Sequence, residues 1–280
     1  MNGSGDILTE RSGRIVQAAK LKKAHGRTST GLFLVEGANA VEAAVEKGCV
    51  RDLFVRASLV DMVVAGQDDI RGIVARARAE HLHVHAVDER AAAKLSDTVT
   101  TPGIFAVCHA DQVLTDLDSA LGVGPALVTI PVDTADPGNA GTLVRLSDAM
   151  GAGSVIFAGN SVDPLGGKVV RASAGSIFHL PVVRHRDTDA VLAAVRQRGM
   201  NLVATAADGE IDITDFKQAG AVLSQPTAWL LGNEAHGLGA ELLAEADYRV
   251  RIPIRGQAES LNLATAAAIC LYESARHLFR

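Results

Sequence analysis

Short runs of apolar residues alternate with longer amphipathic, alanine-rich stretches along the whole chain. The short runs predict strands at 31–36, 52–56, 81–87, 104–108, 126–132, 154–158, 202–206, 228–231 and 248–252. The amphipathic stretches predict helices at 38–47, 68–80, 89–96, 137–150, 188–198, 239–245 and 261–278. Strands that alternate with helices indicate an α/β fold with a mostly parallel sheet.

A polar, acidic stretch at 111–124 interrupts this alternation, because no strong hydrophobic period runs through it. The chain has 280 residues, enough for about two domains. We therefore expect a smaller N-terminal α/β domain at 1–110, a linker at 111–124 and a second domain at 125–280.

The composition excludes several classes of protein. Hydrophobic residues make up 48% and charged residues 21%, which is unlike a disordered or collagen-like chain. No apolar run reaches the length of a membrane helix, and the first residues carry no apolar signal core, so neither a membrane nor secretion is indicated. Cys49, Cys108 and Cys270 lie far apart and predict no disulfide framework, which fits the cytoplasm.

The net charge of −5 argues against nucleic-acid binding by the whole surface, but it leaves room for a local basic patch. Residues 11–27 contain no acidic side chain and read as a helix with a stop near His25 and Gly26. Two interpretations stay open, a solvated helix or an arm that contacts RNA phosphates. The candidate contacts are Arg11, Lys22, Lys23 and Arg27.

The common sites of α/β proteins are missing. No glycine pattern stands between a strand and a helix as a dinucleotide-binding fold requires, and neither a P-loop nor a nucleophile elbow occurs. His81, His83 and His85 could share one strand face, but no nearby cysteine or carboxylate completes a ligand set. We expect no metal site.

Three polar clusters each follow a predicted strand, where ligands collect in open α/β sheets. In the first, Asp136 and Pro137 open a helix that carries Asn139 and Arg145. The second, Leu231-Gly232-Asn233-Glu234-Ala-His-Gly237, places glycines where backbone can approach a ligand. The third runs from Ile252-Pro253-Ile254 to Ser260-Leu261-Asn262.

Each cluster alone has a plain structural interpretation. Arg145 could be an interface or surface arginine, the second cluster could be a turn that starts a helix, and Ser260 could cap the last helix.

Together, and in this order, the clusters resemble the SpoU/TrmH family of RNA ribose methyltransferases, part of the SPOUT superfamily. The first family motif, N-x-G-x-x-x-R, is matched by Asn139, Gly141 and Arg145, and the second, G-N-E-x-x-G, by Gly232, Asn233, Glu234 and Gly237. The third, I-P followed by S-L-N, is matched by Ile252-Pro253 and Ser260-Leu261-Asn262. The resemblance covers residues 125–280, and residues 9–110 look like the substrate-binding domain of ribosomal-RNA members.

The resemblance implies an α/β fold with a C-terminal trefoil knot, S-adenosylmethionine as the cofactor, and a homodimer whose active site draws on both chains. Methyl transfer to a ribose 2′-hydroxyl follows, with ribosomal RNA favoured over transfer RNA because of the extra N-terminal domain. The implied cofactor residues are Thr205, Leu231, Gly232, Gly237, Ile252, Ile254 and Leu261, and the implied catalytic residues are Arg145, Asn139, Glu234, Ser260 and Asn262.

Within this resemblance, Arg145 is the implied key group. Removing a proton from an arginine side chain at neutral pH costs on the order of 8 kcal/mol. A hydrogen-bond donor to the developing alkoxide is therefore a better role than a free base. A transfer-RNA enzyme, an antibiotic-resistance enzyme and a non-catalytic RNA-binding protein remain the alternatives.

Overall fold

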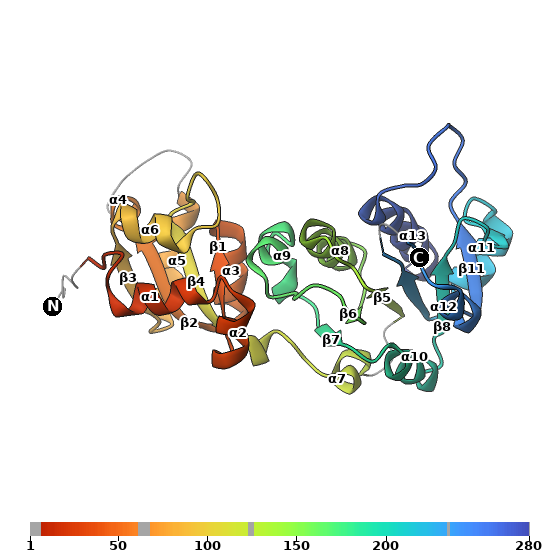
Figure 1. Cartoon of the computed structure of the whole chain (residues 1–280), viewed down its shortest axis with the longest axis horizontal. Helices are drawn as coiled ribbons and strands as arrows, with labels where there is room; N and C mark the ends of the chain where they lie inside the picture. The colour runs from red at the N-terminus through yellow and green to blue at the C-terminus, as the bar shows by residue number, and fades with distance from the viewer. Residues whose placement is uncertain (1–6, 61–67, 123–125, 234–235, 280) are drawn as a thin grey trace. The chain divides into compact units, whose positions relative to one another are not determined.

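A computed structural model describes residues 7–60, 68–122, 126–233 and 236–279. The chain divides into two compact units, and Figure 1 labels most of their helices and strands. Unit 1 comprises Met1–Val113 and Leu165–His179, and unit 2 comprises Leu114–Pro164 and Leu180–Arg280. Each unit is an α/β structure with its own sheet.

The sheet of unit 1 has four strands in the order β1-β4-β2-β3. Its strands are β1 (Leu32–Glu36), β2 (Val50–Arg56), β3 (His83–Val87) and β4 (Ile104–His109). β4 is antiparallel to both β1 and β2, whereas β2 and β3 are parallel, so this sheet is mixed rather than parallel.

Helices cover the sheet of unit 1. The helices are α1 (Gly13–Lys20), α2 (Ala24–Thr30), α3 (Ala38–Lys47), α4 (Ala57–Val60), α5 (Asp68–Ala79), α6 (Glu89–Leu95) and α9 (Gly167–Ala172), with short 3-10 turns at Ala110–Gln112 and Ser176–Phe178. On one face, Ile15 of α1 and Leu95 of α6 pack against Leu34, Phe54 and Phe105. Burying such side chains stabilises a fold by about 1.5–3 kcal/mol each.

The segment Leu165–His179 packs within unit 1, although it lies far along the sequence. The buried carboxylate of Glu36 accepts hydrogen bonds from the Ser96 hydroxyl, from Thr98 Oγ1 at 3.1 Å and from the Asp97 backbone N–H at 3.2 Å. Arg171 of α9 donates to the same carboxylate at 3.0 Å. A buried charge needs such partners, so this cluster ties α9 to β1.

The sheet of unit 2 has seven strands in the order β7-β6-β5-β10-β8-β11-β9, and its recorded pairings are parallel. The strands are β5 (Leu127–Pro131), β6 (Ser154–Ala158), β7 (Val182–His185), β8 (Asn201–Thr205), β9 (Ile211–Asp212), β10 (Thr227–Leu231) and β11 (Tyr248–Arg251). Because side chains alternate along a strand, each face of this sheet buries its own core.

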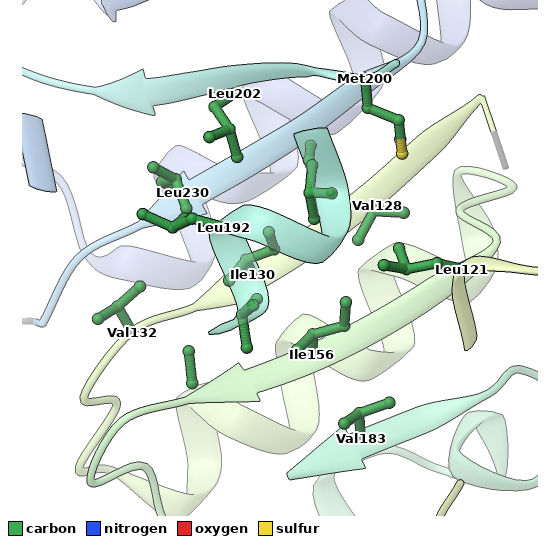
Figure 2. Close-up of a cluster of buried hydrophobic side chains, with 14 of the residues drawn as sticks. Leu121, Val128, Ile130, Val132, Ile156, Val183, Leu192, Met200, Leu202 and Leu230 are labelled. Atoms are coloured by element: carbon green, nitrogen blue, oxygen red, sulfur yellow. The ribbon is translucent and has the colours of Figure 1, made fainter. Parts of the chain in front are cut away.

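On one face, Ala228 and Leu230 of β10 join a cluster that includes Leu192 of α10 (Figure 2). On the other face, Trp229 and Leu231 pack against α8, α11 and α13. The helices of unit 2 are α7 (Leu117–Leu121), α8 (Pro137–Ala149), α10 (Thr188–Gln197), α11 (Phe216–Leu223), α12 (Ala240–Glu245) and α13 (Leu263–Leu278).

The structure also differs from the sequence-based expectations. The expected single helix at 11–27 is two helices, since Lys20 ends α1 and α2 begins at Ala24. The stretch expected as a linker contains α7, which Asp116 caps and which buries Ala120 and Leu121 in the core of unit 2. The division into units places Leu165–His179 with the N-terminal unit, which differs from the expected boundaries.

The trefoil knot concerns the path of the chain, which strand order alone does not establish, so it stays a prediction. Within the described ranges, the structure contains no helix long and apolar enough to span a membrane.

Candidate functional site

A cavity of about 300 Å³ opens at the carboxyl ends of three neighbouring parallel strands of unit 2. This is the edge at which open α/β sheets bind ligands. Residues at the ends of β8, β10 and β11 and in the loops that follow them line it, together with the loop before α13 and the start of that helix. They are Thr205, Ala206, Ala207, Gly232, Asn233, Gly237, Val250, Ile252, Ile254, Glu259, Ser260, Leu261, Leu263 and Ala266.

Two glycines shape the wall formed by the loop after β10. Asn233 and Gly237 exchange backbone hydrogen bonds of 3.1 and 2.8 Å, so the loop folds back on itself. A Cβ atom on Gly232 would lie 2.3 Å from the carbonyl carbon of Gly237, and Gly237 has a φ of +64°. A larger residue at Gly232 would displace the backbone that borders the cavity, whereas at Gly237 there is space for a side chain but the left-handed backbone conformation favours glycine.

The same loop is attached to the end of β5. Asn233 Nδ2 donates to the Asp133 carbonyl oxygen at 2.6 Å. Asp133 adopts a φ of +50°, an uncommon conformation in which Asp is enriched, and its Oδ1 accepts the Asn160 backbone N–H at 2.7 Å. These contacts fix the cavity wall relative to the loop that leads into α8.

Two helices begin beside one another at this edge. Asp136 accepts the Asn139 backbone N–H at 2.8 Å and caps α8, with Pro137 in the first turn, which confirms the expected start of that helix. Asn262 caps α13 by accepting the Ala264 N–H at 2.9 Å. Its Nδ2 also donates to Asn139 Oδ1 at 3.2 Å, which joins the first and third sequence motifs.

The expectation that Ser260 caps the last helix is wrong. The helix begins at Leu263, and Asn262 is its cap residue because the Asn262 side chain reaches the free N–H groups of the first turn. Ser260 is exposed and instead lines the cavity.

Arg145 lies on α8, where its side chain is exposed. It is not among the residues that line the cavity, and the described part of the chain supplies it with no recorded ion pair or hydrogen bond. Glu234 lies outside the described residues.

Six of the seven expected cofactor residues line the cavity, namely Thr205, Gly232, Gly237, Ile252, Ile254 and Leu261. The seventh, Leu231, is fully buried at the end of β10 and packs in the core of unit 2. Asn233 of the second motif also lines the cavity, and so does Glu259, which the sequence did not single out as a site residue although it directly precedes Ser260. Sequence reasoning also missed Asp133, for which no sequence signal was available apart from its place after a strand.

The four candidate RNA contacts of the N-terminal segment separate into two groups. Lys22 Nζ donates to the Ser96 carbonyl oxygen at 2.7 Å and pairs with Asp97 at 3.0 Å. Arg27 is buried and donates to the Leu21 carbonyl oxygen at 2.9 Å. Both side chains therefore hold unit 1 together, whereas Arg11 and Lys23 are exposed.

The histidines of β3 take part in a polar cluster rather than a ligand set. His85 Nε2 lies 3.1 Å from Asp52 Oδ1, and the rings of His83 and His85 stack at 6.3 Å. Burial raises the pKa of Asp52, but hydrogen bonds from Arg51 and His85 outweigh it and leave this pKa below its ordinary value. Within the described ranges, no group of three or more His, Cys, Asp or Glu side chains is arranged to hold a metal.

Comparisons with known proteins match both halves of the chain. Residues 13–106 match the MRM3-like substrate binding domain. The 23S rRNA guanosine 2′-O-methyltransferase RlmP of Bacillus subtilis is 31% identical over 95% of this chain and 97% of its own length. A 23S rRNA uridine 2′-O-methyltransferase of Streptomyces viridochromogenes is 34% identical over 96% of this chain and 91% of its own.

Solved structures agree with these matches. The SpoU methyltransferase AviRb of Streptomyces viridochromogenes, in complex with the cofactor AdoMet, superposes with a TM-score of 0.80 at 32% identity, over 95% of this chain and 98% of that one. An AdoMet-bound rRNA methyltransferase of Sinorhizobium meliloti gives a TM-score of 0.80 at 29% identity, over 98% and 99% of the two chains. Residues 126–272, just over half of the chain, match the model of the SpoU rRNA Methylase family, and the chain belongs to that family.

Proposed function

We propose that this chain transfers a methyl group from S-adenosylmethionine to a ribose 2′-hydroxyl of ribosomal RNA. The observation that carries the proposal is the cavity at the ends of β8, β10 and β11. Ser260 and Leu261 line this cavity, and the next residue, Asn262, is hydrogen-bonded to Asn139. Two relatives that match almost the whole chain are named as methyltransferases for this hydroxyl of 23S rRNA.

The residues of the cavity fit this cofactor. Ile252, Ile254 and Leu261 supply apolar surface for an adenine ring, and the bare backbone around Gly232 and Gly237 allows close approach of its polar edge. When bound, the cofactor supplies a methyl group that its sulfonium already activates. The chain must then align the ribose oxygen with that methyl group, exclude water and stabilise the charge that develops on the oxygen.

Asn139 and Asn262 are the groups that orient the ribose in this proposal. The Asn262 side chain is held by the start of α13, and it donates to the Asn139 side chain at the start of α8, so the two amide groups are positioned together. Arg145 donates hydrogen bonds to the ribose oxygen and to a neighbouring RNA phosphate, as the planar fork of a guanidinium permits. The proton that leaves the 2′-hydroxyl passes to that phosphate or to water. Ser260, on the cavity wall, contacts the ribose, and Glu234 is assigned to hold Arg145 or its loop.

We further propose that the active form is a homodimer. Arg145 is exposed and is not among the residues that line the cavity of its own chain, which supports a site completed by a second copy. α13 packs on the helix that bears Arg145 and exposes Tyr272, while Phe279 is exposed at its end, and these aromatic side chains suit a protein interface.

The N-terminal unit is proposed to bind the RNA substrate, as its match to the MRM3-like substrate binding domain supports. A cytoplasmic location is proposed as well, because ribosomal RNA is the substrate and the three cysteines are free thiols.

Substitution of Arg145 tests the proposed chemistry. Arg145→Ala should abolish methyl transfer to 23S rRNA while leaving the binding of S-adenosylhomocysteine, measured by calorimetry, unchanged. Arg145→Lys keeps the charge but not the fork, and it should stay well below wild-type turnover. Wild-type turnover by Arg145→Ala would refute the assignment.

Mixing two inactive variants tests the dimer. Arg145→Ala and Gly232→Val each remove one part of the site, so mixed dimers formed from both chains should regain activity if the site draws on both copies. No recovery from a verified mixed dimer would place Arg145 with the cavity of its own chain.

A further inference from the structure

A second, larger cavity lies in unit 1, between α1 and α2. Its volume of about 790 Å³ falls in the range of small-molecule sites, about 300–1,000 Å³. Val16, Ala19 and Leu32 give it apolar walls. Nothing in the site described above uses this cavity, because the residues that line the two cavities belong to different units.

The charged side chains around this cavity are all basic. Lys20, Lys23, Arg51 and Lys94 line it, and no Asp or Glu is among the lining residues. Arg51 pairs with Asp52 at 2.8 Å, and Lys94 donates to a backbone carbonyl oxygen. Lys20 and Lys23 have no recorded ion pair or hydrogen bond from their side chains to the described residues, so their charges are available to an anion.

The wall between the two helices is built by specific contacts. A Cβ atom on Gly26 would lie 2.2 Å from the Lys20 carbonyl oxygen, so α2 approaches the end of α1 this closely only with glycine at that position. Arg27 fixes the same junction by donating to the carbonyl oxygens of Leu21 and Lys22 at 2.9 and 3.1 Å. The cavity is therefore bordered by a fixed helix junction, which holds Lys20 and Lys23 at its rim.

We propose that this cavity binds one unpaired nucleotide of the RNA substrate, with its base against the apolar walls and its phosphates beside Lys20 and Lys23. The inference rests on the proposed function, since it takes RNA to be the substrate. Unpaired bases that turn out of a loop are the parts of RNA that proteins recognise in pockets, and lysines supply the accompanying phosphate contacts. His25, which also lines the cavity, offers an aromatic ring for stacking.

The test compares variants in RNA binding over a range of salt concentrations, using an unpaired 23S rRNA loop segment and fluorescence anisotropy. Each phosphate contact to single-stranded nucleic acid contributes about 0.7 to the slope of log K against log salt. Lys20→Gln/Lys23→Gln should lower this slope by about 1.4 and weaken binding about 25-fold at 0.1 M salt. The matched control, Lys47→Gln/Lys217→Gln, removes the same charge from exposed positions that do not line the cavity and should change neither value.

A second variant tests the base-binding part of the proposal. Gln17 is exposed on α1 and lines the cavity, so Gln17→Trp places a bulky side chain at the cavity and obstructs part of it without changing charge. It should weaken RNA binding while leaving the salt slope unchanged. The proposal would be overturned if Lys20→Gln/Lys23→Gln changed the salt slope and the RNA affinity no more than the control variant does. It would also be overturned if Gln17→Trp bound RNA with wild-type affinity.

Turnover separates this inference from the proposed function. With RNA at saturation, both cavity variants should keep the wild-type kcat and raise KM, and they should bind S-adenosylhomocysteine normally. If the wild type transfers methyl groups and the cavity variants have the wild-type KM for RNA, the cavity proposal is refuted and the proposed function is not. Absence of methyl transfer by the wild type would refute the proposed function, and the salt slopes would still decide what the cavity binds.

Discussion

Asn262 caps α13 and donates a hydrogen bond to Asn139, and comparison of two substitutions, Asn262→Ala and Asn262→Asp, separates the two contacts. Asn262→Ala removes the helix cap at Ala264 N–H and the hydrogen bond to Asn139. Loss of a cap costs typically about 1 kcal/mol, and loss of an exposed side-chain hydrogen bond costs about 0.5 kcal/mol. We therefore expect Asn262→Ala to lower the free energy of unfolding of unit 2 by about 1.5 kcal/mol.

Urea denaturation measures this loss through Trp229, the single tryptophan of the chain. Trp229 is buried in β10, and its Nε1 donates to Ser274 Oγ of α13 at 2.8 Å, so its fluorescence reports on the helix that Asn262 caps. With a urea dependence of about 2–3 kcal/mol per molar, the midpoint should fall by about 0.5–0.8 M.

Asn262→Asp is the matched control. A carboxylate can still cap α13, and its charge suits a helix start, so the stability should stay within about 0.5 kcal/mol of wild type. It cannot donate to Asn139 Oδ1, so methyl transfer should fall while S-adenosylhomocysteine still binds. Equal destabilisation by Asp and Ala would refute the capping role, and full activity of Asn262→Asp would refute a role for the Asn139 contact.

Three further predictions concern other parts of the chain. Gly232→Val should abolish S-adenosylhomocysteine binding in calorimetry, because its side chain would occupy the space of the Gly237 backbone; unchanged affinity would contradict the assigned cavity. Ser274→Ala should lower the free energy of unfolding by about 1–3 kcal/mol, because it leaves Trp229 Nε1 buried without an acceptor, and a loss in urea midpoint too small to resolve would contradict this. The lowered pKa of Asp52 stabilises the fold above the unfolded-state value near 3.9, and this contribution is lost as the pH falls through the folded-state pKa. In Asp52→Asn, the free energy of unfolding should therefore depend less steeply on acidic pH, and an equally steep dependence would contradict it.

The sheet of unit 2 was largely predictable from sequence, because its inner strands are short apolar runs with both faces buried. β6 and the start of α8 were predicted at the correct residues, the latter from Asp136 and Pro137. β7 was missed because only its first two residues, Val182 and Val183, are buried, which leaves too short an apolar run to distinguish from a loop.

The packing of Leu165–His179 in unit 1 could not be predicted, because it depends on contacts across more than a hundred residues. Arg171 meets the Glu36 carboxylate, and Phe178 stacks on Phe33 with ring centroids 6.2 Å apart. No local period in the sequence encodes either pair. The same limit applies to Lys22 and Arg27, whose charges suggested RNA contacts but whose partners lie within the fold.

The sequence likewise predicted one part of the candidate site and not another. The second motif identified Gly232 and the family resemblance implied Thr205, and both lie at the carboxyl end of a strand that borders the cavity. The motifs did not reveal that Asn262, rather than Ser260, caps the last helix, because that choice depends on where the backbone turns. They also did not place Arg145 relative to the cavity, which required the three-dimensional structure.

The most direct test of the proposed function is the transfer of an isotope-labelled methyl group from S-adenosylmethionine to unmodified 23S rRNA, followed by digestion and mass spectrometry of the nucleosides. Intact 23S rRNA is the appropriate substrate because the two matched relatives modify different nucleosides, guanosine and uridine. We predict that the label appears in a 2′-O-methylated nucleoside with the wild-type chain and is absent with Arg145→Ala. Label on a base, or no label in RNA from a chain that binds S-adenosylhomocysteine, would contradict the account.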